Sequence, residues 1–203
     1  MASVLYLVRH GESAGNVNPG LRRGDDPPLT DRGRAQATRA AAALGPAGLE
    51  AVFCSSLRRA RETAEVIGSA AGLEIQPVDG FGEVDMGALS NSDRPEDRAA
   101  REVIFSAWLA GDRSRSFPGG EDFAAVAGRV REGLLALVQA KPGIRAALVT
   151  HRMPIAAAAE LCEPGGAVIV PGACPNGSIT TLRVEEDDRF RLVAWCDERI
   201  AAP

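Results

Sequence analysis

Short apolar runs alternate with segments of helical periodicity along this chain. The runs predicted as buried β-strands cover 3–8, 51–54, 73–78 and 145–150. Apolar residues recur at helical spacing between the runs and predict helices over 30–44, 57–71, 95–110, 121–140 and from Pro154 onward. The alternation predicts an α/β fold with a mostly parallel sheet.

Turn and capping residues set the expected boundaries. Thr30 is a candidate N-cap for the first long helix, and Ser55 and Ser56 are candidate caps for the next one. The segment 80–120 is less regular, and the C-terminal part predicts a hairpin of 178–184 and 190–196. Without repeats or a linker-like stretch, the pattern predicts a single domain over 1–203.

Charge and hydropathy exclude several classes of protein. The chain of 203 residues has a net charge of −4, which argues against nucleic-acid binding through bulk charge. It has no apolar run near the roughly 20 residues of a membrane span, and no signal peptide is visible before the first strand. We therefore expect a cytoplasmic protein that binds neither membranes nor nucleic acid.

The cysteines and the single lysine argue against a zinc site and against lysine-dependent chemistry. The four cysteines form no CxxC pair, and with two histidines in the chain no zinc site of plausible spacing results. Free thiols are the expectation. The single lysine, Lys141, lies in a Lys-Pro-Gly turn, which argues against Schiff-base and P-loop chemistry.

Both histidines directly follow a predicted strand. His10 comes after 3–8 and His151 comes after 145–150. In open α/β sheets the ligand crevice lies outside the carboxyl ends of the strands. Two histidines at the same end of one sheet therefore favour a functional site over two unrelated structural residues.

The segment around His10 resembles the signature of the histidine phosphatase superfamily, in its phosphoglycerate mutase-like branch. Arg9-His10-Gly11-Glu12 followed by Asn16 carries this resemblance. Five later segments continue it in the family's order: Arg23-Gly24 with Pro28-Leu29-Thr30, Ser56-Leu57-Arg58-Arg59-Ala60 with Thr63, Glu83-Val84-Asp85-Met86-Gly87, Pro118-Gly119-Gly120-Glu121, and Asn176-Gly177-Ser178. The resemblance implies a three-layer α/β/α sandwich.

The resemblance also implies a phosphohistidine mechanism. An imidazole nucleophile can attack phosphorus if it is neutral, and arginine's planar fork suits the phosphoryl oxygens. His10 would be the nucleophile, and Glu83 would protonate the leaving oxygen and later activate water. The groups that would bind the phosphate are Arg9, Arg59, His151, Asn16, Arg23 and the main chain of Gly24. Neither a metal nor another cofactor is required.

The residues after the second histidine depart from the family pattern. Arg152-Met153-Pro154 stands where the family usually has two glycines. Arg152 either binds a second anionic group of the substrate or is a solvated arginine. The loop 111–116, with Arg113 and Arg115, is either a solvated loop or a substrate lid.

Three functions remain open for this sequence. The leading one is a phosphatase that acts on a small phosphomonoester. The alternatives are a phosphoglycerate mutase-type phosphotransferase, whose family members are typically longer, and a phospho-ligand binding protein that has lost catalysis. A homodimer is a possible assembly, and the substrate's identity stays undetermined.

Overall fold

The computed structural model describes residues 1–18, 26–90, 92, 94–162 and 174–197. A six-stranded sheet in the order β3-β2-β4-β1-β5-β6 forms its centre. The strands are β1 (Ser3–Arg9), β2 (Ala51–Cys54), β3 (Ile75–Pro77), β4 (Arg145–Thr150), β5 (Ile179–Val184) and β6 (Phe190–Asp197). The first four strands run parallel to one another, β5 pairs antiparallel with β1, and β6 pairs antiparallel with β5. The predicted α/β class with a mostly parallel sheet is confirmed.

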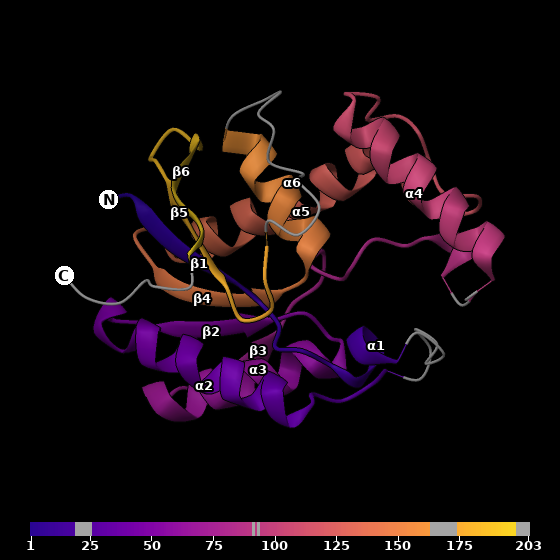
Figure 1. Cartoon of the computed structure of the whole chain (residues 1–203). Coiled ribbons are helices and arrows are strands. Elements are labelled where there is room, and N and C mark those ends of the chain that lie inside the picture. The colour runs from indigo at the N-terminus through magenta and orange to yellow at the C-terminus, as the bar shows by residue number, and fades with distance from the viewer. Residues whose placement is uncertain (19–25, 91, 93, 163–173, 198–203) are drawn as a thin grey trace.

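Helices cover both faces of the sheet (Figure 1). On one side lie α2 (Asp31–Leu44) and α3 (Arg58–Ala71), and on the other lie α5 (Phe123–Ala140) and α6 (Arg152–Cys162). Alternate residues of β1 point to opposite faces, so Tyr6 and Val8 join one core cluster while Leu5 and Leu7 join the other. Because both faces are covered, the central strands are apolar over most of their length. This is the expected three-layer sandwich.

The remaining elements are short apart from one helix. They are α1 (Ala14–Val17), the 3₁₀ helices η2 (Gly45–Ala47) and η3 (Gly87–Leu89), and α4 (Pro95–Leu109). Within the described residues, no helix combines the length and apolar character needed to cross a membrane.

The loop that follows β1 packs tightly against the start of α2. Thr30 caps this helix as predicted, because its hydroxyl accepts a hydrogen bond from the Gly33 N–H at 3.0 Å. A Cβ at Gly11 would lie 2.3 Å from the Gly33 carbonyl oxygen. Only glycine permits this approach. The main chain after His10 therefore packs directly against the first turn of α2.

The cap of α3 differs from the sequence prediction. The N-cap residue is Leu57, without a side-chain cap, and the Arg58 N–H donates to both carboxylate oxygens of Asp26 at 2.9 Å. Ser55 instead hydrogen-bonds His151. The Ser55/Ser56 cap prediction is therefore wrong, because a carboxylate distant in sequence supplies the acceptor.

The irregular segment 80–120 is anchored by aromatic packing. Trp108 of α4 is fully buried, with Phe105, Phe117 and Phe123 around it at centroid distances of 5.4, 5.4 and 5.6 Å. Its indole N–H donates to the Arg115 carbonyl at 2.6 Å. Edge-to-face packing of this kind fixes α4 beside the N-terminus of α5.

Candidate active site

The register of two neighbouring strands brings both histidines together. Arg9 pairs with Thr150 in the parallel β1–β4 ladder, and the His10 N–H donates to the Thr150 carbonyl at 3.0 Å. The imidazole rings of His10 and His151 consequently lie with their centroids 5.0 Å apart. Both side chains are buried. The site thus lies at the carboxyl edge of the parallel strands.

The hydrogen-bond partners of His10 assign its tautomer. Nδ1 lies 2.7 Å from the Gly11 carbonyl oxygen, which can only accept, so Nδ1 carries the proton. The Arg59 Nε–H can only donate, and it lies 3.1 Å from Nε2 of His10. The Nε2 atom therefore holds a lone pair, as a nucleophilic imidazole requires.

Burial and two cations keep this ring neutral. Desolvation lowers the pKa of His10 well below its usual value, and the positive charges of Arg59 and Arg9 lower it further. The hydrogen bond to Gly11 acts in the opposite direction. Desolvation and the two arginines prevail, so the neutral form dominates at physiological pH.

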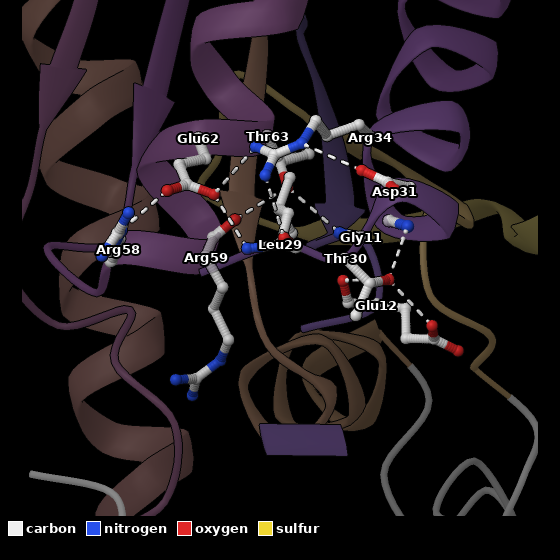
Figure 2. A network of polar contacts seen from close by, with 11 residues as sticks. Gly11, Glu12, Leu29, Thr30, Asp31, Arg34, Arg58, Arg59, Glu62 and Thr63 are labelled. Atoms are coloured by element: carbon white, nitrogen blue, oxygen red, sulfur yellow. Dashed lines mark hydrogen bonds and ion pairs between the residues drawn. The ribbon is translucent and has the colours of Figure 1, made fainter. Parts of the chain in front are cut away.

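The Thr63 side chain links the loop that carries His10 to the helix that carries Arg59. Its hydroxyl accepts from the Gly11 N–H at 3.1 Å and donates to the Arg59 carbonyl at 2.8 Å. Figure 2 shows this chain of contacts, with the Arg59 side chain extending away from the network. Thr63 is fully buried. One hydroxyl thereby fixes the loop that carries His10 relative to the helix that carries Arg59.

Glu62 reinforces the same corner of the molecule. Its carboxylate accepts from the Leu29 N–H at 2.8 Å and from the Arg58 Nε–H at 2.7 Å, as Figure 2 shows. Desolvation raises the pKa of Glu62, but the Leu29 and Arg58 hydrogen bonds and the charges of Arg58 and Arg34 outweigh it, so the pKa is lowered. The segment before α2 is thereby attached to α3.

Arg9 is held by the segment that precedes β5. Its Nη1–H donates to the Cys174 carbonyl, while its Nε has no hydrogen-bond partner among the described residues. Burial lowers the pKa of Arg9 below its usual value. A partly buried guanidinium with remaining donor capacity is suited to an anionic ligand.

His151 and Glu83 are each positioned by one neighbour across the site. Nε2 of His151 lies 2.9 Å from the Ser55 hydroxyl oxygen. Oε1 of Glu83 accepts from the Met153 N–H at 3.2 Å and from the Val84 N–H at 2.9 Å. Glu83 therefore meets one of the first N–H groups of α6, which have no acceptor within the helix.

A cavity of about 220 Å³ opens over these groups. Its lining includes five of the residues that the sequence singles out: Arg9, His10, Asn16, Arg59 and Glu83. His151 is not part of the lining but lies against the His10 ring. Arg23 and Gly24 lie outside the described residues.

Arg152 stands at the edge of the site. Its guanidinium carbon lies 5.4 Å from the centroid of the Phe105 ring, a cation–π arrangement with α4. Its positive charge is close enough to contribute to the lowered pKa of Arg9. α6 begins at Arg152, two residues before the predicted Pro154. Proline is tolerated in the first helical turn because N–H groups there lack intrahelical acceptors.

Several supporting residues receive no role from the sequence alone. Thr63 and Asn176 occur in the matching segments, but their contacts are visible only in the structure. The Asn176 side-chain amide donates to the His10 carbonyl at 2.9 Å. Within the described ranges, no group of three or more His, Cys, Asp or Glu side chains could hold a metal ion.

The buried neutral imidazole of His10 lies beside two arginines at the carboxyl edge of an α/β/α sandwich, an arrangement that can combine nucleophilic chemistry with the binding of a phosphoryl group. Residues 5–198 match the family model of the histidine phosphatase superfamily (branch 1), and the chain belongs to this family. The family resemblance stated from the sequence is confirmed.

Relatives of known name include mutases and phosphatases. A probable phosphoglycerate mutase GpmB of Salmonella paratyphi B is 31% identical over 147 residues, which cover 72% of this chain and 68% of that protein. The solved structure of mycobacterial hydrolase 1 has a TM-score of 0.83 and 30% identity, covering 97% of this chain and 99% of its own. A mycobacterial glucosyl-3-phosphoglycerate phosphatase solved with VO3 has a TM-score of 0.81 and 29% identity, covering 95% and 98%. These similarities support a phosphatase.

Proposed function

We propose that this chain is a phosphatase that hydrolyses a small phosphomonoester through a phosphohistidine on His10. The observation that carries the proposal is the hydrogen bonding of the His10 ring. Its Nδ1–H is held by Gly11, and its Nε2 lone pair faces the Arg59 donor. A nucleophile with a fixed orientation and a lowered pKa is ready to attack without first losing a proton.

In the first step, Nε2 of His10 forms a bond to phosphorus while the bond from phosphorus to the ester oxygen breaks. The transferred group carries its negative charge on three oxygens, and Arg9, Arg59 and His151 surround the position of Nε2. Arg59 exchanges its hydrogen bond with Nε2 for one with the arriving phosphate. Preorganised cations of this kind stabilise charge that develops in the transition state. Asn16 supplies a further polar group at the cavity wall.

Glu83 supplies the proton transfers. Its carboxyl group lines the cavity and is fixed by the Met153 N–H. As a general acid it protonates the leaving oxygen, and as a general base it takes a proton from the water that attacks the phosphohistidine. Water then forms the new bond to phosphorus, and Nε2 of His10 leaves.

The identity of the phosphoryl acceptor separates this proposal from a mutase. The similarity to a probable phosphoglycerate mutase favours transfer to a substrate hydroxyl as the second candidate. In a mutase the phosphohistidine is consumed by that hydroxyl, and free phosphate does not accumulate. Both functions require His10, whereas a binding protein would form no phosphoenzyme.

Rapid mixing with an aryl phosphate, followed by alkaline quenching, tests the proposal. We expect acid-labile phosphate on His10 in the wild-type protein and none in His10→Ala. Turnover in ¹⁸O-labelled water should place one heavy oxygen in each released phosphate. Phosphate that appears only with a bisphosphate primer would establish the mutase. A protein that forms neither phosphoenzyme nor phosphate is a binding protein.

The outer part of the site points to an anionic substrate. The positive charge of Arg152 lies close enough to Arg9 to lower the pKa of Arg9, and the guanidinium of Arg152 packs on the face of the Phe105 ring. We propose that Arg152 binds a second anionic group of the substrate through a charge-assisted hydrogen bond.

The single domain over 1–203 and the homodimer remain predictions. Light scattering on the purified protein measures its mass in solution and tests the homodimer.

A further inference from the structure

Two cysteines, Cys174 and Cys196, lie near Arg9 but do not line the cavity. Cys174 is buried just before β5, and Cys196 is partly buried near the end of β6. Each thiol shifts the pKa of the other, so the two sulfur atoms lie within range of electrostatic interaction. Each also contacts a hydroxyl of the adjacent chain, with Cys174 Sγ 3.5 Å from Ser178 Oγ and Cys196 Sγ 3.4 Å from Thr180 Oγ1.

An irregularity of β6 creates this contact. Ile179 pairs with Asp197 but Thr181 pairs with Ala194, so the bulge places an extra residue on β6. Cys196 adopts a φ of 41°, a conformation that is uncommon for residues other than glycine. Its N–H donates to Thr180 Oγ1 at 3.1 Å. The bulge holds Cys196 in a strained conformation in which its thiol lies against Thr180, on the side of β5 that also carries Ser178, the partner of Cys174.

We propose that Cys174 and Cys196 form a site of reversible oxidation, at which a peroxide converts the two thiols into a disulfide. The Cys196 thiolate attacks one peroxide oxygen, giving a sulfenic acid and releasing hydroxide. Cys174 sulfur then attacks the Cys196 sulfur, the S–OH bond breaks, and water is released. Two electrons pass from the thiols to the peroxide, and a dithiol reductant reverses the reaction.

The environment of the two sulfurs assigns their roles. Cys196 is only partly buried, and its interaction with Cys174 and its contact with Thr180 lower its pKa. Cys174 is buried, and the interaction with Cys196 and this burial raise its pKa. A thiolate that is partly exposed reacts with small oxidants, whereas a buried thiol suits the resolving step.

Oxidation would act on the active site through the main chain of Cys174. The Cys174 carbonyl accepts from the Arg9 guanidinium. A disulfide needs about 2.05 Å between its sulfurs, much less than the separation of two sulfur atoms that are not bonded. Closing that distance moves Cys174 and the acceptor that orients Arg9. This consequence rests on the proposed phosphatase function, whereas the disulfide itself does not.

The experiment treats the full-length protein with hydrogen peroxide and follows two readouts in parallel. Peptide mapping should show Cys174 cross-linked to Cys196, with Cys54 and Cys162 still alkylated. Cys54 is buried and its pKa is raised to about 11, so it provides an unreactive internal reference. Aryl phosphate hydrolysis should fall about 10-fold or more as the cross-link forms, because one phosphate donor is displaced. Dithiothreitol should restore it.

Two variants make the test specific. Cys196→Ser should retain the basal activity and resist peroxide, because Cys196 itself contacts neither the cavity nor Arg9 by a hydrogen bond. Cys162→Ser should remain as sensitive as the wild type. Oxidation without a Cys174–Cys196 cross-link, or loss of the cross-link in Cys162→Ser, overturns the proposal. If the cross-link forms and a measurable aryl phosphate hydrolysis stays unchanged, the proposed effect of the disulfide on Arg9 is wrong. A cross-link in a protein that never hydrolyses phosphate refutes the phosphatase function alone.

Discussion

The inner and the outer end of the site are built by different means. At the inner end, buried His10 is held by main-chain and side-chain bonds from β4, α3 and the Asn176 segment. At the outer end, Arg152 rests on the face of Phe105, a contact between two partly exposed side chains. The inner end is thus fixed by the fold, whereas the outer end depends on a few replaceable side chains.

This difference separates chemistry from substrate choice. The strand register that forms the sheet also places the inner-end groups, so we expect a substitution there to disturb catalysis on every substrate. For the outer-end groups we expect a contribution to binding energy that depends on the substrate's second group. Substitutions at the two ends should therefore leave different kinetic patterns.

The largest effect is expected for His10, the proposed nucleophile. His10→Ala should lower kcat about 10³-fold or more on all substrates, because no neighbouring group can form the phosphoenzyme. Steady-state assays with an aryl phosphate and with a substrate that carries a second anion measure this. Circular dichroism should show a folded variant. Equal activity of variant and wild type would remove His10 from the mechanism.

A smaller loss that depends on the leaving group is expected at Glu83. Glu83→Gln should reduce turnover about 10²-fold for alkyl phosphates, since an alkoxide needs a proton to leave. Activated aryl phosphates should be less affected, unless hydrolysis of the phosphohistidine limits the rate. Comparing the two series by kcat tests the role. An unchanged rate in both would assign the proton transfers to another carboxylate.

At the outer end, Arg152→Ala should raise KM by about 10- to 100-fold for substrates with a second anionic group. kcat should stay unchanged, since the lost contact is present in both ground and transition states. A neutral aryl phosphate should show little change. Arg131→Ala, at an exposed position of α5, is the matched control. Equal KM effects on both substrates would exclude anion recognition by Arg152.

Variants of Thr63 test whether the buried Thr63 hydroxyl fixes the position of His10. Thr63→Val leaves the Gly11 N–H without its acceptor, which should lower the free energy of unfolding by about 1–3 kcal/mol. Thr63→Ser retains the hydroxyl and should recover kcat. Denaturant unfolding and aryl phosphate assays measure both effects. If valine and serine variants have the same kcat, the hydroxyl does not position the nucleophile.

The smallest effect concerns pH and stability. His10 has its pKa lowered in the folded protein, so below about pH 6.5 the unfolded chain binds a proton that the folded one excludes. Stability is therefore lost as pH falls from that value toward the folded pKa. The wild type should lose up to about 1.4 kcal/mol per pH unit more than His10→Ala. Parallel pH profiles of unfolding would contradict a buried neutral imidazole.

Sequence patterns determined the framework of this protein. The strand runs, the helical spacing and the Thr30 cap express local preferences, and the structure follows them closely. The placement of both histidines was also readable, because strands of one parallel sheet end at the same edge.

Only the tertiary structure decided which distant groups meet. The Asp26 cap on α3, the Thr63 bridge and the Cys174 carbonyl on Arg9 join segments far apart in the chain. No periodicity encodes such contacts, because they depend on how loops pack after the sheet has formed. The same holds for Arg152, whose position over Phe105 depends on where the aromatic cluster places α4. Local pattern determines elements and edges, whereas packing determines the partners of each side chain.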